Sequence, residues 1–293
     1  MDYGLKQSLK VLIALACGVS VTAASISIND KNNSKTLEKN EQINETIEPP
    51  NYTPISRTES QVGKYADING DGTVDGIIFA DLAVGVSGTW NEYDKSLQYA
   101  QLGGTFSYPK ESISKDYYVS QKSYTNKLGG TAEVITPIGT GNDRFYVMAL
   151  ENTPDNHITF DWYHSAIYHM NDYANISSLN FGTGYNNTLK IINKWQNNSY
   201  GEKDACIVHK DLWGQIQNQV NNGWFMPSSG EWAAFAYNLQ INPANYSKKG
   251  LSGWYWSSSQ YNISNAWYAN LNQGIIGSAG AEDAYSIRLA HTF

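Results

Sequence analysis

Residues 222–239, NGWFMPSSGEWAAFAYNL, predict an amphipathic helix that begins at a defined turn. Ser228 and Glu231 have the spacing of a capping box, in which the hydroxyl and the carboxylate each accept a backbone N–H. Pro227 favours extended backbone at the residue before it. The apolar residues that recur at helical spacing are Trp232, Phe235, Ala236 and Leu239. We expect them to form one buried helix face that covers a sheet.

Three segments after this helix have the composition of strands, namely residues 253–260 (GWYWSSSQ), 265–274 (NAWYANLNQG) and 284–293 (AYSIRLAHTF). Residues 144–150 (RFYVMAL) predict a further buried strand. Between residues 150 and 222, apolar residues recur at helical spacing in three places and predict three buried helix faces. The first face contains Tyr163, Ala166, Ile167, Met170 and Ala174. The second contains Leu189, Ile191, Ile192 and Trp195, and the third contains Leu212, Trp213, Ile216 and Val220. This order predicts an α+β fold with helices on a twisted, mainly antiparallel sheet.

The motifs W-x-x-P-S…E-W (residues 224–232), YWSSS (residues 255–259) and RLAHTF (residues 288–293) occur in this order. Residues 160–293 therefore resemble the C-type-lectin-like domain of bacterial major paralogous domain proteins and of the variable proteins of diversity-generating retroelements. The resemblance implies a C-type-lectin-like domain over residues 151–293. Formylglycine-generating enzymes have a related fold, and their activity depends on a C-terminal cysteine pair that holds copper. This chain has no cysteine after Cys206, so that activity is not expected.

Composition restricts the class of protein. The 293 residues are 41% hydrophobic and 13% aromatic, which is enough for a sizeable core. The net charge is −7, and Arg57, Arg144 and Arg288 are the only arginines. A surface that binds phosphates needs clustered cations, so we expect no nucleic-acid partner.

The N-terminus has the layout of a signal peptide over residues 1–24, because Lys6 and Lys10 precede an apolar or small stretch at residues 11–24. We expect a secreted or cell-surface protein. A lipid anchor at Cys17 is the alternative to cleavage. Either way Cys206 is the single thiol of the folded part, so no intramolecular disulfide is expected. Residues 25–64 are polar and contain few large apolar side chains, which predicts a disordered linker.

Residues 67–75, DINGDGTVD, have the pattern of a calcium loop and open a strand-rich part that we assign to residues 65–150. The predicted ligands are Asp67, Asn69, Asp71, the Thr73 carbonyl and Asp75, and Gly70 and Gly72 allow a tight turn. Ile78 occupies the position of the usual bidentate carboxylate, so we expect Asp81 to complete the site. The alternative is a metal-free turn, since Asn, Asp and Gly favour turns. Calcium would have a structural role.

No catalytic site is predicted. His164 and His169 are five residues apart and miss the spacing of two ligands on one helix face. Residues 182–187 (GTGYNN) lack the Lys of a phosphate-binding loop. Ser257, Ser258 and Ser259 lack the nucleophile elbow.

We therefore expect an adhesion or recognition protein whose ligand is an extracellular protein or a glycan. A secreted hydrolase with an unidentified site and a structural envelope protein are the alternatives. Strand alternation places Trp267, Ala269 and Leu271 in the core and Tyr268, Asn270 and Asn272 on an exposed face. Tyr and Asn are typical of adaptable binding surfaces. The alternative is an ordinary polar face of a half-buried sheet. The full expected ligand-binding set is Tyr261, Asn262, Asn265, Tyr268, Asn270, Asn272 and Gln273.

Arg288 interrupts the apolar side of the last expected strand. We expect it to be internal and paired with a carboxylate, and Glu231 is the first choice of partner.

Overall fold

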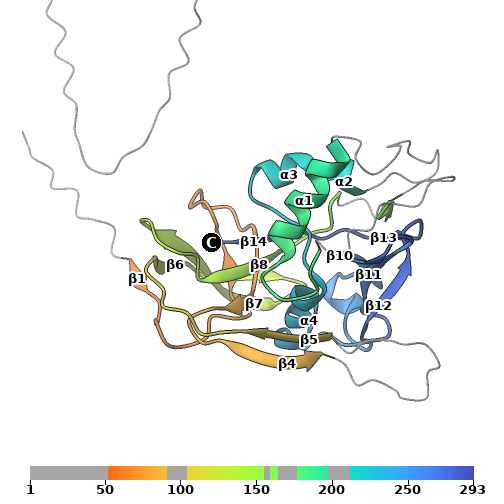
Figure 1. Ribbon diagram of the computed structural model, residues 1–293. Helices are drawn as coiled ribbons and strands as arrows, with labels where there is room; N and C mark the ends of the chain where they lie inside the picture. Colours follow the sequence, from red (N-terminus) through yellow and green to blue (C-terminus); the bar gives the residue numbers. More distant parts are fainter. Residues whose placement is uncertain (1–51, 91–103, 155–158, 164–176, 197–211) are drawn as a thin grey trace, which may run out of the picture. The chain divides into compact units, whose positions relative to one another are not determined.

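The computed structural model describes residues 52–90, 104–154, 159–163, 177–196 and 212–293 (Figure 1). Residues 50–293 form one compact unit. The expected signal peptide, Cys17, Cys206, His164, His169 and most of the first expected helix face lie outside the described residues. Within the described ranges, no helix has both the length and the apolar character needed to cross a membrane.

A seven-stranded sheet has the order β1–β6–β7–β2–β3–β8–β14. Its strands are β1 (Thr53–Pro54), β2 (Tyr65–Ala66), β3 (Gly76–Asp81), β6 (Asp116–Asn126), β7 (Gly130–Ile138), β8 (Phe145–Ala149) and β14 (Ala290–Thr292). Only β2 and β7 pair in parallel among these neighbours. The predicted strand at residues 144–150 is confirmed as β8.

A second sheet is antiparallel and contains β10 (Trp254–Asn262), β11 (Asn265–Asn270) and β12 (Ile275–Gly280). Two small ribbons pair β4 (Val86–Trp90) with β5 (Gly104–Tyr108) and β9 (Phe160–Asp161) with β13 (Ala284–Tyr285). The helices are α1 (Gly184–Gln196), α2 (Leu212–Gln215), α3 (Gln217–Asn221), α4 (Ser229–Asn238) and the 3₁₀ turn η1 (Ser247–Lys249). The α+β class is confirmed.

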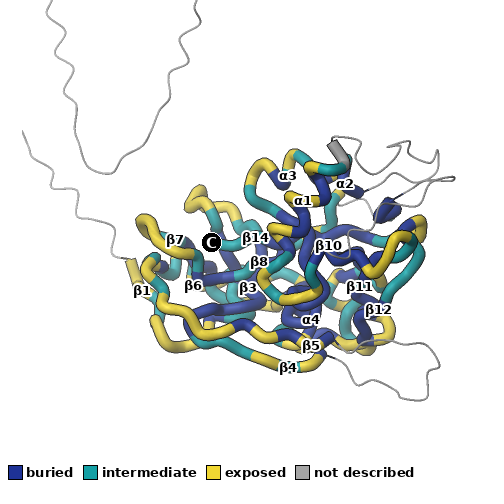
Figure 2. Tube along the Cα trace, in the orientation of Figure 1, coloured by how far each residue is buried: buried dark blue, intermediate teal, exposed yellow. Residues whose placement is uncertain are grey.

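Helix α4 begins as predicted. The Ser228 hydroxyl accepts the Glu231 N–H, and the Ser228 N–H donates to the Glu231 carboxylate at 2.6 Å. Every residue from 229 to 236 is buried (Figure 2). The helix is therefore buried on all sides there, whereas the sequence predicted a single buried face. The reason is that α4 contacts β3, β4, β5, β10 and β11.

The β10–β11 sheet separates two apolar cores. On one side, Trp232 of α4 stacks on Tyr255 with ring centroids 4.7 Å apart, and Phe235 meets the edge of Phe79. On the other side, Trp256 packs with a cluster that contains Trp162 and Trp213. Aromatic pairs of this kind add stability beyond the area that they bury.

The other predicted helix faces agree only in part. Ile191 and Ile192 of α1 are buried, but Leu189 is 39% exposed. Residues 212–220 form two short helices, α2 and α3, rather than one. The four predicted apolar residues of this third face, Leu212, Trp213, Ile216 and Val220, are all buried.

The expected boundary at residue 150 does not separate two bodies. β14, at the C-terminus, pairs with β8, so residues from both expected parts share one sheet. The expected linker is also too long. Residues 53–54 form β1 beside β6, and Gln61 is buried. These residues are ordered because their backbone groups satisfy buried partners in the sheet.

Arg288 is internal, as predicted, with 1% of its surface exposed. Its expected pairing with Glu231 is wrong. The guanidinium donates to the Ala149 and Leu150 carbonyls at 3.1 and 2.8 Å and to Asn152 Oδ1 at 3.0 Å. Backbone and amide oxygens therefore satisfy this cation, because β14 places it beside the end of β8.

Glu231 is used elsewhere. Its Oε1 accepts the Gly182 and Gly184 N–H groups at 3.1 and 3.2 Å, and its Oε2 accepts the Ser228 N–H. One carboxylate thus caps α4 and fixes the loop that precedes α1. A Cβ at Gly184 would overlap Glu231 Oε2 and lie 2.7 Å from the Met226 carbonyl oxygen.

We predict that Gly184→Ala lowers the free energy of unfolding by about 2 to 4 kcal/mol, because the added methyl group displaces this loop from Glu231. The measurement is urea unfolding followed by tryptophan fluorescence. Gly253→Ala is the control, since a Cβ there meets its nearest atom at an ordinary 3.6 Å. Equal stability of both variants would contradict the close approach at Gly184.

Burial raises the pKa of Glu231 to about 7, although the three backbone N–H groups lower it in part. Because the folded-state pKa exceeds the ordinary value of 4.5, this carboxyl group stabilises the fold most below about pH 4.5. That contribution is lost as the pH rises through about 7, and it amounts to at most about 3 kcal/mol, since one pKa unit is worth about 1.4 kcal/mol.

We predict that the unfolding free energies of the natural protein and of Glu231→Gln differ by an amount that changes between pH 5 and pH 8. The natural protein should lose more stability over this interval, because Gln cannot ionise. Denaturant unfolding at both pH values tests this. Parallel pH profiles of the two proteins would show that Glu231 does not titrate in this range.

Candidate functional site

The expected calcium loop is closed by its own backbone. Asp67 Oδ1 accepts the N–H groups of Gly70 and Asp71 at 2.8 and 3.1 Å, and Oδ2 accepts the Gly72 N–H and the Thr136 hydroxyl. Asp67 thus accepts four hydrogen bonds, three of them from the backbone of the loop. The loop therefore has the bonding pattern of an Asx-rich turn.

The other expected ligands gather near Asp67. Asn69 Nδ2 donates to Asp71 Oδ2 at 3.0 Å, and Asp75 Oδ2 accepts the Ile68 N–H. Burial raises the pKa of Asp75, and the negative charges of Asp67 and Asp71 raise it further. In the described part of the chain, no three His, Cys, Asp or Glu side chains are grouped so that they could hold a metal ion. Calcium binding stays a prediction, and it requires Asn69 and Asp71 to turn from each other toward an ion.

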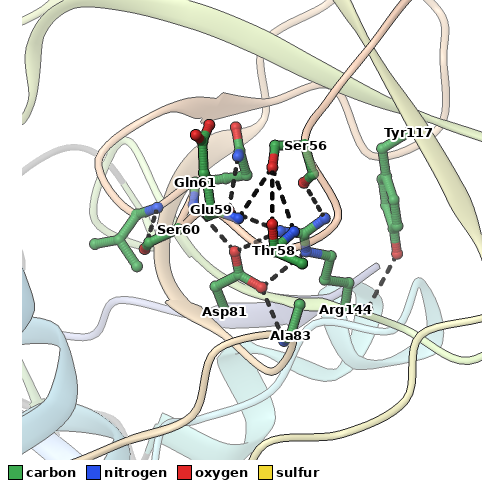
Figure 3. Close-up of polar contacts among 10 residues, drawn as sticks. Ser56, Thr58, Glu59, Ser60, Gln61, Asp81, Ala83, Tyr117 and Arg144 are labelled. Carbon is green, nitrogen blue, oxygen red and sulfur yellow. Dashed lines mark hydrogen bonds and ion pairs between the residues drawn. The ribbon is translucent and has the colours of Figure 1, made fainter.

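Asp81 is not a ligand of this loop, which corrects the sequence prediction. Its buried carboxylate accepts Arg144 Nε and Nη2 at 2.8 and 2.9 Å and the N–H groups of Gln61 and Ala83 (Figure 3). The six residues of β3, Gly76–Asp81, carry Asp81 about 20 Å from Asp75 at the end of the loop. An extended strand cannot fold back to supply the missing position.

Arg144 explains why residues 56–61 are folded. Its Nη1 donates to the Ser56 carbonyl at 2.9 Å and its Nη2 to the Glu59 carbonyl at 3.0 Å (Figure 3). The Arg144–Asp81 pair is fully buried, and each of its partners is satisfied by further hydrogen bonds. Its role is therefore to fix the N-terminal segment to the sheet.

The expected binding residues fall into two separate groups. Tyr261 is 49% exposed, and with Asn262 and the half-buried Asn265 it lies where β10 ends and β11 begins. Asn272 and Gln273 lie exposed in the turn between β11 and β12. These two groups are at opposite ends of β11, so they do not form one continuous patch.

Tyr268 and Asn270 are not on an exposed face, so that expectation is wrong. Asn270 is 3% exposed, its Oδ1 accepts the Gln273 N–H, and its Nδ2 donates to Gln273 Oε1. Tyr268 is half-buried against Trp256 and Tyr285. Strand alternation places Tyr268 and Asn270 on the same face of the sheet, as predicted. This face is not exposed to solvent, because β13 covers it.

The predicted core side of β11 is confirmed, because Trp267, Ala269 and Leu271 are buried. The three serines of β10, Ser257, Ser258 and Ser259, are also buried, and the Ser257 hydroxyl donates to the Trp267 carbonyl. Ser258 accepts the Asn187 amide and Ser259 donates to the Ser178 carbonyl, so all three hydroxyls are inaccessible.

A groove of about 500 Å³ lies beside the β11–β12 turn. The last turn of α4 provides Tyr237, and the segment after it provides Gln240 and Asn242. The end of β4 provides Thr89 and Trp90, and the turn provides Gln273. We call this the amide groove. Of these residues, the sequence indicated only Gln273. The others come from segments far apart in the chain and carry no shared motif.

The amide groove is held by defined contacts. The Trp90 indole N–H donates to the Ile241 carbonyl at 2.9 Å, which fixes β4 to the end of α4. Tyr237 is 45% exposed, and its ring packs edge-on against the Phe106 ring with the ring centroids 5.4 Å apart. Asn270 holds the Gln273 amide at 2.9 Å. The groove is therefore formed before any ligand arrives.

We predict that the loop at residues 67–75 binds one calcium ion and that the ion raises the melting temperature. An ion present at about 100 times its dissociation constant adds about 2.7 kcal/mol. Calcium titration followed by calorimetry tests this, with Asp71→Ala as the variant that should lose the response. Equal melting temperatures in calcium and in chelator, with no calcium detected by elemental analysis, would refute it.

No protein-family model and no curated protein matches this sequence. The structure is similar to that of a fimbrial protein from Bacteroides ovatus, with a TM-score of 0.40 and 15% sequence identity. The similarity covers 80% of this chain and 49% of the fimbrial protein, so the chain spans about half the length of that protein. A similarity at this level supports no conclusion on function.

Proposed function

We propose that this protein is a secreted or cell-surface ligand-binding protein and that the ligand binds at the amide groove. The observation that carries this proposal is the convergence of Tyr237, Gln240, Asn242 and Gln273 on one preformed cavity. Concave sites with aromatic walls and a few fixed polar groups are typical of ligand-binding proteins.

The chemistry of the groove favours binding over hydrolysis. Of the lining residues that the structure describes, only Tyr237 carries a titratable side chain, and the other polar side chains are amides, the Thr89 hydroxyl and the Trp90 indole. General acid–base catalysis needs a positioned group that exchanges protons near the working pH. Amides exchange none, but each offers donors and an acceptor to a ligand.

The remaining parts of the proposal rest on the sequence. A signal peptide at residues 1–24 would export the chain. Residues 151–293 would form a C-type-lectin-like domain that shares its sheet with residues 52–150. Calcium in the loop at residues 67–75 would stabilise the N-terminal part of this sheet. The ligand would be an extracellular protein or a glycan.

The test measures binding of the labelled exported chain, residues 25–293, to whole cells and to extracted cell-surface material. Tyr237→Ala and Gln273→Ala should each weaken binding by about tenfold or more, because residues at the centre of a binding site carry most of its energy. Tyr261→Ala at the other end of β11 is the matched control and should bind like the natural protein.

Melting temperatures of all three variants show whether they fold. Loss of binding in Tyr261→Ala alone would move the ligand to the β10–β11 turn and contradict the assigned site. Binding by none of the proteins, natural chain included, would contradict the proposed function.

A further inference from the structure

We infer that the amide groove recognises an uncharged glycan, an inference that rests on the proposed function and specifies its ligand class. The lining of the groove provides the first argument. Gln240 and Gln273 contribute two amide groups. The Asn242 amide is engaged by its own turn, because its Oδ1 accepts the Ala244 N–H at 2.9 Å. Among the described residues that line the groove, none is Asp, Glu, Lys, Arg or His. A charged ligand would lose hydration there without gaining an ion pair from these residues.

Amides and sugar hydroxyls have matching hydrogen-bonding capacity. A hydroxyl both donates and accepts, and a Gln or Asn side chain presents two donor hydrogens and an acceptor oxygen. Adjacent hydroxyls on a sugar ring can therefore bind one amide at two points. Gln273 is suited to this role. Its side-chain oxygen accepts a hydrogen bond from Asn270 Nδ2, which fixes the amide and leaves its nitrogen free for a ligand.

Tyr237 provides a flat apolar surface beside these amides. Its ring packs across Gly88, where a Cβ would lie 3.0 Å from the ring, and against the edge of Phe106. These contacts fix the ring while 45% of the residue stays exposed. A fixed aromatic ring packs against the C–H face of a sugar at little entropic cost.

Gln240 supplies an independent argument. It is the only non-glycine residue with positive φ among the described residues, at 53°. The Ile241 N–H donates to the Ala236 carbonyl at 2.8 Å and the Gln240 N–H to the Tyr237 carbonyl at 3.1 Å, which is the pattern of a helix end that normally carries glycine. A residue held in this conformation at the rim of a cavity indicates that its side chain is used.

An uncharged glycan fits these observations better than a peptide. Peptide recognition commonly uses a free strand edge or paired charges. The groove instead lies at the end of a helix and a turn between strands, and it offers side-chain amides rather than a row of backbone groups.

The test uses Gln240→Gly, which removes the amide and replaces the strained residue with the one that this conformation favours. A merely structural role of Gln240 predicts no loss of binding and a melting temperature equal to or above that of the natural protein. We expect the melting temperature to follow this pattern while affinity for a neutral oligosaccharide falls by about tenfold.

The probes are neutral oligomers of glucose, mannose, galactose and N-acetylglucosamine, with sialylated and sulfated oligosaccharides as charged counterparts. Calorimetry with the exported chain should detect binding of at least one neutral oligomer. That binding should be unchanged between about 0.05 and 0.5 M NaCl, because screening does not affect an uncharged ligand. Asn262→Ala, at the β10–β11 turn, should bind as the natural protein does.

The outcomes separate the two proposals. If cell-surface material binds through Tyr237 and Gln273 but no neutral oligomer does, the glycan inference fails and the ligand-binding function stands. Preference for a charged oligosaccharide, or neutral binding that Gln240→Gly leaves unchanged, also overturns the inference. If neither surface material nor any oligomer binds, both proposals fail.

Discussion

The Glu231 carboxylate is the interaction on which the rest of the structure depends. It is fully buried and accepts three backbone N–H groups, from Ser228 at the start of α4 and from Gly182 and Gly184 before α1. A buried carboxylate without such partners would cost several kcal/mol, so the loop and the helix must stay together once they are folded. Because α4 is held at its N-terminal end, its apolar sides pack against both sheets, and its C-terminal end lies beside β4 and the β11–β12 turn, where the amide groove forms.

Two buried arginines are likewise held by several hydrogen bonds, and both lie at the seven-stranded sheet. Arg144 binds Asp81 and the carbonyls of residues 56 and 59, and Arg288 binds the carbonyls at the end of β8. Each cation has left water and is satisfied by oxygen acceptors, a carboxylate and two carbonyls for Arg144, and backbone and amide oxygens for Arg288. These two residues attach the first and last described segments of the chain to one sheet. The expected boundary at residue 150 fails because β14 pairs with β8 across it and Arg288 binds carbonyls at the end of β8.

In the β10–β11–β12 sheet, strand alternation decides the face on which a side chain lies but not whether that face is exposed. One face carries Trp267, Ala269 and Leu271 toward α4, as expected. The opposite face carries Tyr268 and Asn270, and β13 lies over it through Tyr285. The exposed polar side chains of this sheet therefore lie at its ends, where Gln273 is exposed at the turn and Asn270 holds the Gln273 side chain.

The sequence by itself determined the local structure: the capping box at Ser228 and Glu231, the buried strand at residues 145–149, the core side of β11 and the α+β class. These depend on residues within a few positions of one another, whose spacing is fixed by helix and strand geometry. Only the tertiary structure decided the partners of Arg288, Glu231 and Asp81, the burial of Asn270 and the existence of the amide groove. Most of these bring together residues that lie far apart in the chain, such as Asp81 with Gln61 and Trp90 with Ile241. No local pattern specifies such a pairing, because backbone carbonyls and N–H groups are present at almost every position and only packing selects which of them a buried side chain meets.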